Sequence, residues 1–218
     1  MTAPVVHLQG VAHRLAARFA LDIPTLTIGP GITAVLGANG SGKTTLLRIL
    51  ATVIEPQQGD LVVGGVMVDE ATLTDVRRRL GYLPQDDSVP RRLPAFDHVD
   101  LVAVMREIGP DHRTRRAAVH RALTEVDLAE LGSERCSRLS GGQRRRVAVA
   151  AALVGDAPYL VLDEPDAHLD HDQRTRLGEV LRARATTATI VVSTHDHPWA
   201  ATIADRTIHL AGGRVVSA

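Results

Sequence analysis

The residues with the clearest chemical meaning lie near the start of the chain, at positions 37–44. They read Gly-Ala-Asn-Gly-Ser-Gly-Lys-Thr and match G-x-x-x-x-G-K-[ST] at every fixed position. Glycines in such a loop let consecutive backbone N–H groups point at phosphate oxygens, and the helix that follows adds its positive end. The sequence therefore predicts a site for a nucleoside triphosphate. Its candidate binding residues are Gly37, Ala38, Asn39, Gly40, Ser41, Gly42, Lys43, Thr44 and Thr45.

Lys43 is the only lysine among the 25 basic residues of the chain. An ammonium group differs from a guanidinium group in size and hydrogen-bonding geometry, so one retained lysine indicates a role that arginine cannot fill. We expect Lys43 to bridge the β- and γ-phosphates and the Thr44 hydroxyl to ligate Mg²⁺. The alternative is a glycine turn with a surface lysine, and the apolar strand before the loop and the helix after it disfavour that reading.

Two adjacent carboxylates, Asp163 and Glu164, follow the apolar run Tyr-Leu-Val-Leu at 159–162. A buried parallel strand would deliver both at its carboxyl end, where ligands bind in open α/β sheets. Asp163 is suited to hold Mg²⁺ through water, and Glu164 to polarise the water that attacks the γ-phosphate. Strands also end in acidic residues simply to begin a loop, so the pair is informative only beside the phosphate loop.

A second anion-binding feature is the pentapeptide Leu-Ser-Gly-Gly-Gln at 139–143. A small hydroxyl residue and two glycines just before a helix form a second helix terminus at which an anion can bind. One chain has no obvious need for two such termini on a single triphosphate. The surplus terminus therefore needs an explanation.

Five features together resemble the nucleotide-binding subunit of ABC transporters. In chain order they are the phosphate loop at 37–44, Gln85, residues 139–143, Asp163-Glu164 and His195. The intervals between them are also similar to those of that family, and the resemblance covers essentially the whole chain. It implies ATP and Mg²⁺ as cofactors. It also implies an α/β fold, a P-loop NTPase (RecA-like) core with a short N-terminal antiparallel β-subdomain and an inserted α-helical subdomain.

The resemblance further implies that two such subunits sandwich two ATP molecules. In each site one subunit would supply the phosphate loop, the Mg²⁺ ligands and Glu164. The other subunit would supply the signature segment, Ser140, Gly141, Gly142 and Gln143, to the γ-phosphate. This arrangement would explain the surplus anion-binding terminus.

The resemblance also gives roles to two isolated polar residues. Gln85 would sense Mg²⁺ and the attacking water and pass the state of the site to a membrane partner, and His195 would contact the γ-phosphate. Taken alone, Gln85 reads as a solvated loop residue and His195 as a packed or capping residue. The expected catalytic residues are then Glu164, His195, Lys43 and Gln85, and the expected metal ligands are Thr44, Gln85 and Asp163.

Some positions depart from the family pattern. Leu15 stands where the family places an aromatic residue against adenine, and Phe19 is the nearby substitute. Ala167 lacks the hydroxyl that helps communication across the dimer. Asp166 adds a carboxylate near the γ-phosphate region, where it would either slow turnover or face solvent.

The composition limits the classes of function. The chain has 218 residues with 25 basic and 25 acidic side chains, and this net charge of zero offers no basic footprint for nucleic acid. Its one cysteine cannot form an intrachain disulfide, which fits a reducing compartment. The sequence shows neither the ~18 consecutive apolar residues of a membrane helix nor a signal peptide. We expect a cytoplasmic protein, peripheral on the inner face of the cell membrane through a transmembrane partner.

The elements that must position these residues alternate as in an α/β layer protein. The stretch 86–137 is predicted to be an all-helical insertion with Asp111 as a helix cap. The whole of 1–218 is then a single domain with a core of 1–85 and 138–218. The arginine triplets at 77–79 and 144–146 are predicted to be solvated helix faces. Strands are predicted at 5–8, 21–28, 32–36, 82–83, 159–162 and 189–193, hairpins at 61–68 and 207–216, and helices at 43–52, 97–108, 111–126, 141–154, 170–184 and 197–204.

The leading hypothesis is an ATPase that dimerises with an identical copy or a close paralogue and drives transport by a separate transmembrane subunit. The apolar stretch at 101–105 of the helical insertion would receive that partner, and residues 81–86 resemble subunits of small exporters of drugs, lipids or polysaccharides. One alternative is a soluble non-transport ABC-type ATPase, which usually carries a coiled coil, a zinc insertion or a second unit. The other is a nucleotide-binding module with little hydrolysis, against which Lys43 and Glu164 argue.

Overall fold

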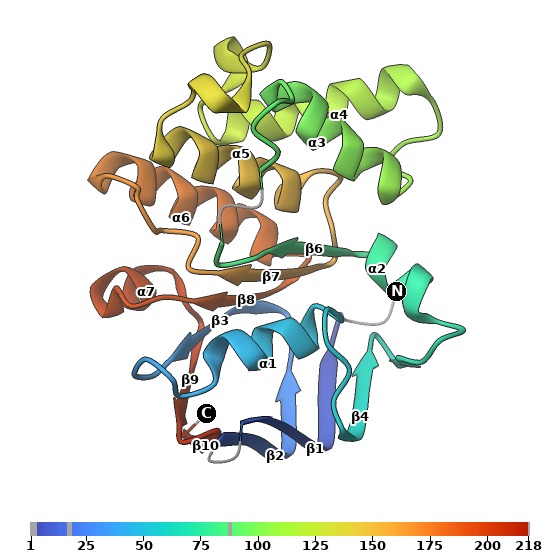
Figure 1. Ribbon diagram of the computed structural model, residues 1–218, viewed down its shortest axis with the longest axis vertical. Helices are drawn as coiled ribbons and strands as arrows, with labels where there is room; N and C mark the ends of the chain where they lie inside the picture. Colours follow the sequence, from blue (N-terminus) through green and yellow to red (C-terminus); the bar gives the residue numbers. More distant parts are fainter. Residues whose placement is uncertain (1–3, 17–18, 87–88, 218) are drawn as a thin grey trace.

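A six-stranded sheet with the strand order β10-β9-β3-β8-β7-β6 forms the centre of the fold (Figure 1). The computed structural model describes residues 4–16, 19–86 and 89–217. The four strands β3, β8, β7 and β6 run parallel, β9 is parallel to β3, and β10 is antiparallel to β9. Apart from small shifts at their ends, these are the strands that the apolar runs predict. They are β3 (Gly31–Leu36), β6 (Leu80–Leu83), β7 (Tyr159–Asp163), β8 (Thr189–Ser193), β9 (Arg206–Ala211) and β10 (Arg214–Ser217).

A second, antiparallel sheet has the order β2-β1-β4-β5. Gly64 and Gly65 join its last two strands, and both have positive φ angles (60° and 79°), as a two-residue hairpin turn requires. β1 is longer than predicted, because the apolar residues within 9–16 are interrupted by polar ones and the strand conformation there comes from pairing with β2 and β4. The strands are β1 (Val6–Ala16), β2 (Phe19–Ile28), β4 (Gln58–Val63) and β5 (Val66–Met67).

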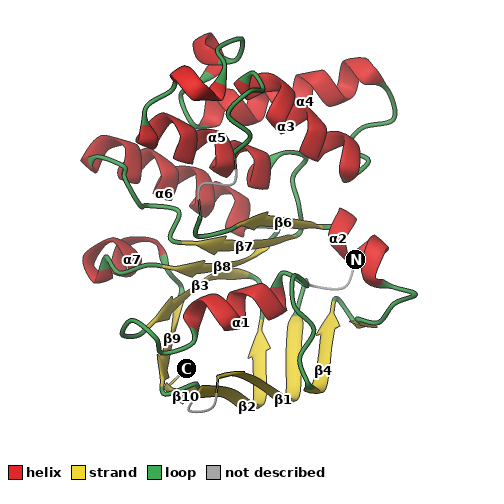
Figure 2. Ribbon diagram, viewed as in Figure 1, coloured by secondary structure: helices red, strands yellow, loops and turns green. Residues whose placement is uncertain are grey.

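Helices cover both faces of the central sheet, as Figures 1 and 2 show. α1 (Lys43–Leu50) packs against one face, and α5 (Gly141–Leu153) and α6 (His171–Ala185) pack against the other. α7 (His197–Ile203) follows β8. A short helix, α2 (Leu73–Arg78), lies in a stretch for which the sequence predicted none.

The segment 86–137 contains α3 (Ala95–Met105) and α4 (His112–Glu125), both packed on α5, and two 3₁₀ turns, Ala129–Leu131 and Cys136–Arg138. The predicted cap is confirmed, since the Asp111 carboxylate accepts a hydrogen bond of 2.7 Å from the Thr114 amide. The division of the chain into a core and a helical insertion stays a prediction. Within the described ranges, no helix is both long and apolar enough to span a bilayer.

Strand β7 is packed on both of its faces by apolar core residues, which fix the position of its carboxyl end. Tyr159 and Val161 pack into the apolar cluster on the α1 face, and Leu160 and Leu162 pack into the cluster on the α5 face. All four are at most 4% exposed. Because burial of such a side chain stabilises the fold by about 1.5–3 kcal/mol, the strand is held firmly from both sides. Its carboxyl end, Asp163, therefore has a fixed position.

Candidate active site

The loop between β3 and α1 has the backbone shape of an anion cradle. Gly37, Gly40 and Gly42 all have positive φ angles, at 155°, 76° and 106°. A Cβ atom on Gly37 would lie 2.3 Å from the carbonyl oxygen of Leu210, so a larger residue does not fit there. Gly42 caps α1 in the left-handed conformation and has no side chain that could accept from the first-turn N–H groups. Those donors are therefore available to an anion at the start of the helix.

Lys43 is folded over this loop. Its side chain is 6% exposed, and its Nζ donates to the carbonyl oxygens of Gly37 (2.7 Å) and Ala38 (3.3 Å). Burial lowers the pKa of the ammonium group, and the nearby carboxylates of Glu164 and Asp163 oppose that shift. The ammonium is thus held over the phosphate loop, within the field of both acidic residues.

A chain of hydrogen bonds joins four of the predicted site residues. The Thr44 hydroxyl donates to Gln85 Oε1 and Gln85 Nε2 donates to Glu164 Oε1, both at 3.3 Å. His195 Nε2 lies 2.9 Å from the same Glu164 oxygen. Gln85, Glu164 and His195 follow the carboxyl ends of β6, β7 and β8, so the parallel sheet brings them together at one edge. They line a cleft of about 580 Å³ with Asn39, Gly40, Ser41, Gly42, Lys43, Thr44 and Thr45.

Asp163 offers a buried oxygen atom beside this cleft. The residue is 1% exposed, and its Oδ1 accepts a hydrogen bond from the Ser193 hydroxyl. Its Oδ2 has no hydrogen-bond partner among the described residues, although it is buried. Carboxylate, hydroxyl and amide oxygens are the ligands that Mg²⁺ prefers, so Asp163 with Thr44 and Gln85 fits a magnesium site.

Glu164 has an unusual backbone. Its φ angle is 51°, a left-handed conformation that few residues other than glycine adopt and that clusters at functional sites. The conformation is held by its amide, which donates to the carbonyl oxygen (3.1 Å) and the hydroxyl (3.0 Å) of Ser193. The turn points the carboxylate toward Gln85 and His195 rather than along the strand.

The segment 139–143 begins α5, on the sheet face opposite α1. Ser140 caps the helix, and its side chain and that of Gln143 bond each other's amides at 3.2 and 2.8 Å. A Cβ atom on Gly142 would lie 2.8 Å from the His168 carbonyl oxygen, which explains the second glycine. Among the described residues, those that line the cleft include none from 140–143. The predicted site residues therefore form two groups, one at the cleft and one at the start of α5.

The prediction that residues 144–146 are a solvated face is wrong for Arg145. This side chain is 1% exposed, and it donates hydrogen bonds to the carbonyl oxygens of Pro84 and Glu164. Spacing along the helix does not single out Arg145, because residues 147–154 are all buried and each of the three arginines therefore shares an i, i+3, i+4 stripe with buried residues. An arginine on an apolar stripe needs polar partners inside the protein.

Comparison with known proteins shows the family. Residues 21–167 match the sequence model described as ABC transporter. The chain is 37% identical to the nickel import ATP-binding protein NikO of Rhodobacter capsulatus, over 99% of this chain and 89% of that protein. The chain belongs to the ABC transporter family. It is also 34% identical to the macrolide export ATP-binding/permease protein MacB 1/2 of Paracoccus denitrificans, over 99% of this chain and 33% of that protein.

Solved structures agree with this assignment. A bacterial ABC transporter cassette solved as a dimer matches the ABC subunit described here with a TM-score of 0.88 and 26% identity, over 97% of each chain. The same cassette in a post-hydrolysis state, bound to ADP and phosphate, matches equally well. The P-loop NTPase fold and the ATPase activity predicted from the sequence are thus confirmed. ABC cassettes dimerise and work with transmembrane subunits in ATP-driven transport, whereas the roles of individual site residues here stay predictions.

Two departures from the ABC pattern have different outcomes. Asp166 is half-buried and accepts a hydrogen bond of 2.7 Å from the Thr194 hydroxyl, and burial raises the pKa of its carboxyl group. It therefore packs against the residue before His195 instead of facing solvent. The side chains of Leu15 and Phe19, the candidates for adenine contact, lie outside the described residues.

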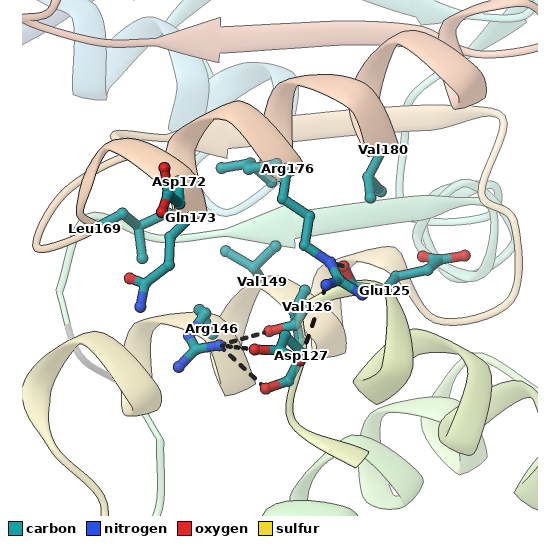
Figure 3. Close-up of a pocket in the computed structure, with 11 residues that line it drawn as sticks. Glu125, Val126, Asp127, Arg146, Val149, Leu169, Asp172, Gln173, Arg176 and Val180 are labelled. Carbon is teal, nitrogen blue, oxygen red and sulfur yellow. Dashed lines mark hydrogen bonds and ion pairs between the residues drawn. The ribbon is translucent and has the colours of Figure 1, made fainter.

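A separate pocket of about 200 Å³ lies between α4, α5 and α6 of the ABC subunit (Figure 3). Its floor is apolar, and Arg146 crosses one side, where it donates to the carbonyl oxygens of Val126 (3.0 Å) and Asp127 (3.1 Å). Arg176 contacts Asp127 from the α6 side. Among the described residues, this pocket shares no lining residue with the nucleotide cleft. It lies where α5 and α6 pack against the end of α4 in the helical segment.

Proposed function

We propose that this ABC subunit hydrolyses ATP in a dimer that encloses two ATP molecules, and that the dimer drives transport by a separate transmembrane partner. The separation of the two groups of site residues carries this proposal. The signature segment 140–143 begins α5, and the cleft is lined by other residues among those described. A second subunit, which can be an identical copy or a close paralogue, supplies its own signature segment to complete each cleft.

The phosphate groups of ATP bind to the loop at 37–42 and to the first turn of α1. The hydrogen bonds of Lys43 to the carbonyl oxygens of Gly37 and Ala38 are then replaced by hydrogen bonds to β- and γ-phosphate oxygens. These charge-assisted bonds offset the free-energy cost of burying the ammonium group. Thr44, Asp163 and Gln85 would hold Mg²⁺. When bound, Mg²⁺ neutralises charge on the β- and γ-phosphates.

Glu164 acts as the base for the attacking water. Its carboxylate already accepts a hydrogen bond from the Gln85 amide, and His195 Nε2 lies beside the same oxygen. These two neighbours fix its orientation, so that its free oxygen receives the proton of the water as that water attacks the γ-phosphorus. His195 also lies where its imidazole can donate to a γ-phosphate oxygen.

The outer surface of α3 is the proposed contact with the transmembrane partner. Leu101, Val104 and Met105 are 47%, 47% and 72% exposed, which places an apolar patch on the helical segment. This contact would hold the protein on the inner face of the cell membrane. Relatives named as importers and exporters match at similar identity, and the exporter-like segment 81–86 is the feature that favours export.

The substitution Glu164→Gln tests this function. It keeps the size of the side chain and its contacts but removes the base, so we expect normal ATP binding, a loss of turnover of at least about 100-fold and a stable ATP-bound dimer. Steady-state hydrolysis and gel filtration with Mg²⁺ and ATP measure the two effects. Hydrolysis at the wild-type rate would overturn the assignment of Glu164.

A further inference from the structure

The guanidinium group of Arg145 lies buried where strands β6 and β7 end. Its Nη1 donates to the carbonyl oxygens of Pro84 (2.8 Å) and Gln85 (3.2 Å). Its Nη2 donates to the carbonyl oxygens of Asp163 and Glu164, the latter at 2.8 Å. One side chain thus bonds the backbone of the two loops that carry Gln85 and Glu164 into the cleft.

The register of the sheet explains why an arginine is needed at this point. The last paired residues of β6 and β7 are Leu83 and Leu162, and beyond them the two chains separate. Beyond these residues, the carbonyl groups of Pro84, Asp163 and Glu164 are partly or fully buried and need donors, because an unpaired buried carbonyl is costly. Arg145 supplies these donors from its planar guanidinium group, with one nitrogen bonding the segment after β6 and the other the segment after β7. A lysine ammonium cannot reproduce this geometry.

We infer that Arg145 is a positioning residue for ATP hydrolysis. It holds the Gln85 loop against the Glu164 turn and so sets the 3.3 Å contact between the Gln85 amide and the Glu164 carboxylate. It also ties both loops to α5, the helix that begins with the signature segment. The inference rests on the proposed roles of Gln85 and Glu164. Arg145 itself is outside the set of residues that line the cleft.

Two other arginines show that this arrangement is particular to Arg145. Arg146, the next residue, instead bonds the carbonyl oxygens of Val126 and Asp127 (Figure 3). Arg106 is also buried on backbone carbonyl groups, those of Val154 (2.7 Å) and Arg78 (3.3 Å). Arg106 also lies outside the cleft lining, and the residues whose carbonyl groups it bonds are not proposed site residues. Arg106 is therefore the matched control.

The test compares Arg145→Gln and Arg145→Lys with Arg106→Gln and Arg106→Lys in the full chain. We expect Arg145→Gln to lower kcat about 10- to 100-fold, the effect of displacing reacting groups by about 1 Å, with an ATP-analogue affinity within about threefold of wild type. The kcat of Arg145→Lys should lie between those of Arg145→Gln and the wild type. If Arg145→Gln does not fold, Arg145→Lys alone provides the test. The Arg106 variants should lose thermal stability and keep kcat. A folded Arg145 variant with wild-type kcat, or a loss of affinity without a loss of kcat, would overturn the inference.

A double-mutant cycle separates positioning from a general structural effect. If Arg145 acts through Gln85, Arg145→Gln should reduce kcat by less than about twofold in a Gln85→Ala background. A full additional loss in that background would overturn the inference. The single variants Gln85→Ala and Glu164→Gln keep the two proposals distinguishable. Wild-type kcat in both would reject the proposed site itself, whereas their loss of turnover beside an active Arg145→Gln variant would reject only the role of Arg145.

Discussion

Replacing Ser193 by alanine removes one buried hydroxyl group that holds both carboxylate residues at the end of β7. The residue is 0% exposed, and its Oγ donates to Asp163 and accepts from the Glu164 amide at 3.0 Å. A hydrogen bond to a charged group is worth about 1.5–3 kcal/mol. The Glu164 amide keeps a second acceptor, the Ser193 carbonyl oxygen at 3.1 Å, so that loss adds about 1 kcal/mol or less. We expect Ser193→Ala to lower the free energy of unfolding by about 1.5–4 kcal/mol.

Urea unfolding followed by circular dichroism measures this difference, and Ser133→Ala, at an exposed serine, is the control. The control should change the free energy of unfolding by less than about 0.5 kcal/mol. Saturating Mg²⁺ and a non-hydrolysable ATP analogue should shrink the Ser193→Ala deficit, because a cation beside Asp163 offsets the charge of the carboxylate that has lost its donor. A deficit no larger than that of the control would refute the role of the hydroxyl. A deficit unchanged by Mg²⁺ and nucleotide would refute Asp163 as a ligand.

Two further substitutions test single groups in the cleft. Lys43→Ala should weaken ATP-analogue binding about 10- to 100-fold in a fluorescence titration, since charged hydrogen bonds to phosphate are lost; unchanged affinity would contradict the loop assignment. Asp166 has a carboxyl pKa raised from 3.8 by burial, so its ionised form costs folding free energy above that pKa and the cost is absent at lower pH. Asp166→Asn should therefore raise the thermal midpoint at pH 7, and the gain should vanish near pH 3; an equal gain at both pH values would refute this reasoning.

The phosphate loop and the end of β7 could be predicted from the sequence because each is a local pattern. The glycines of 37–42 are set by the turn they make, and the run 159–162 is apolar because both faces of β7 are buried. The proximity of Gln85, Glu164 and His195 could be expected only from the family resemblance, because it depends on which strands are neighbours in the sheet.

Other features depend on contacts between distant segments, and the sequence did not reveal them. Arg145 is buried because the carbonyl groups that it bonds come from two other strand ends. α2 has six residues with one of them, Val76, buried, so its apolar periodicity is too short to detect. Arg77, which also lies in α2, donates a hydrogen bond to the hydroxyl of Thr52, 25 residues earlier in the chain.

The central claim is that each catalytic site takes its two halves from two protomers, and mixing two inactive variants tests it most directly. Lys43→Ala disables the phosphate-loop half of a site, and Ser140→Arg blocks the signature half. In a mixed dimer, the intact loop of the Ser140→Arg chain meets the intact signature segment of the Lys43→Ala chain, which restores one of the two sites. The account predicts that each variant alone is inactive and that an equimolar mixture recovers roughly a quarter of the wild-type rate. A mixture as inactive as its components, or wild-type hydrolysis by Ser140→Arg alone, would contradict it.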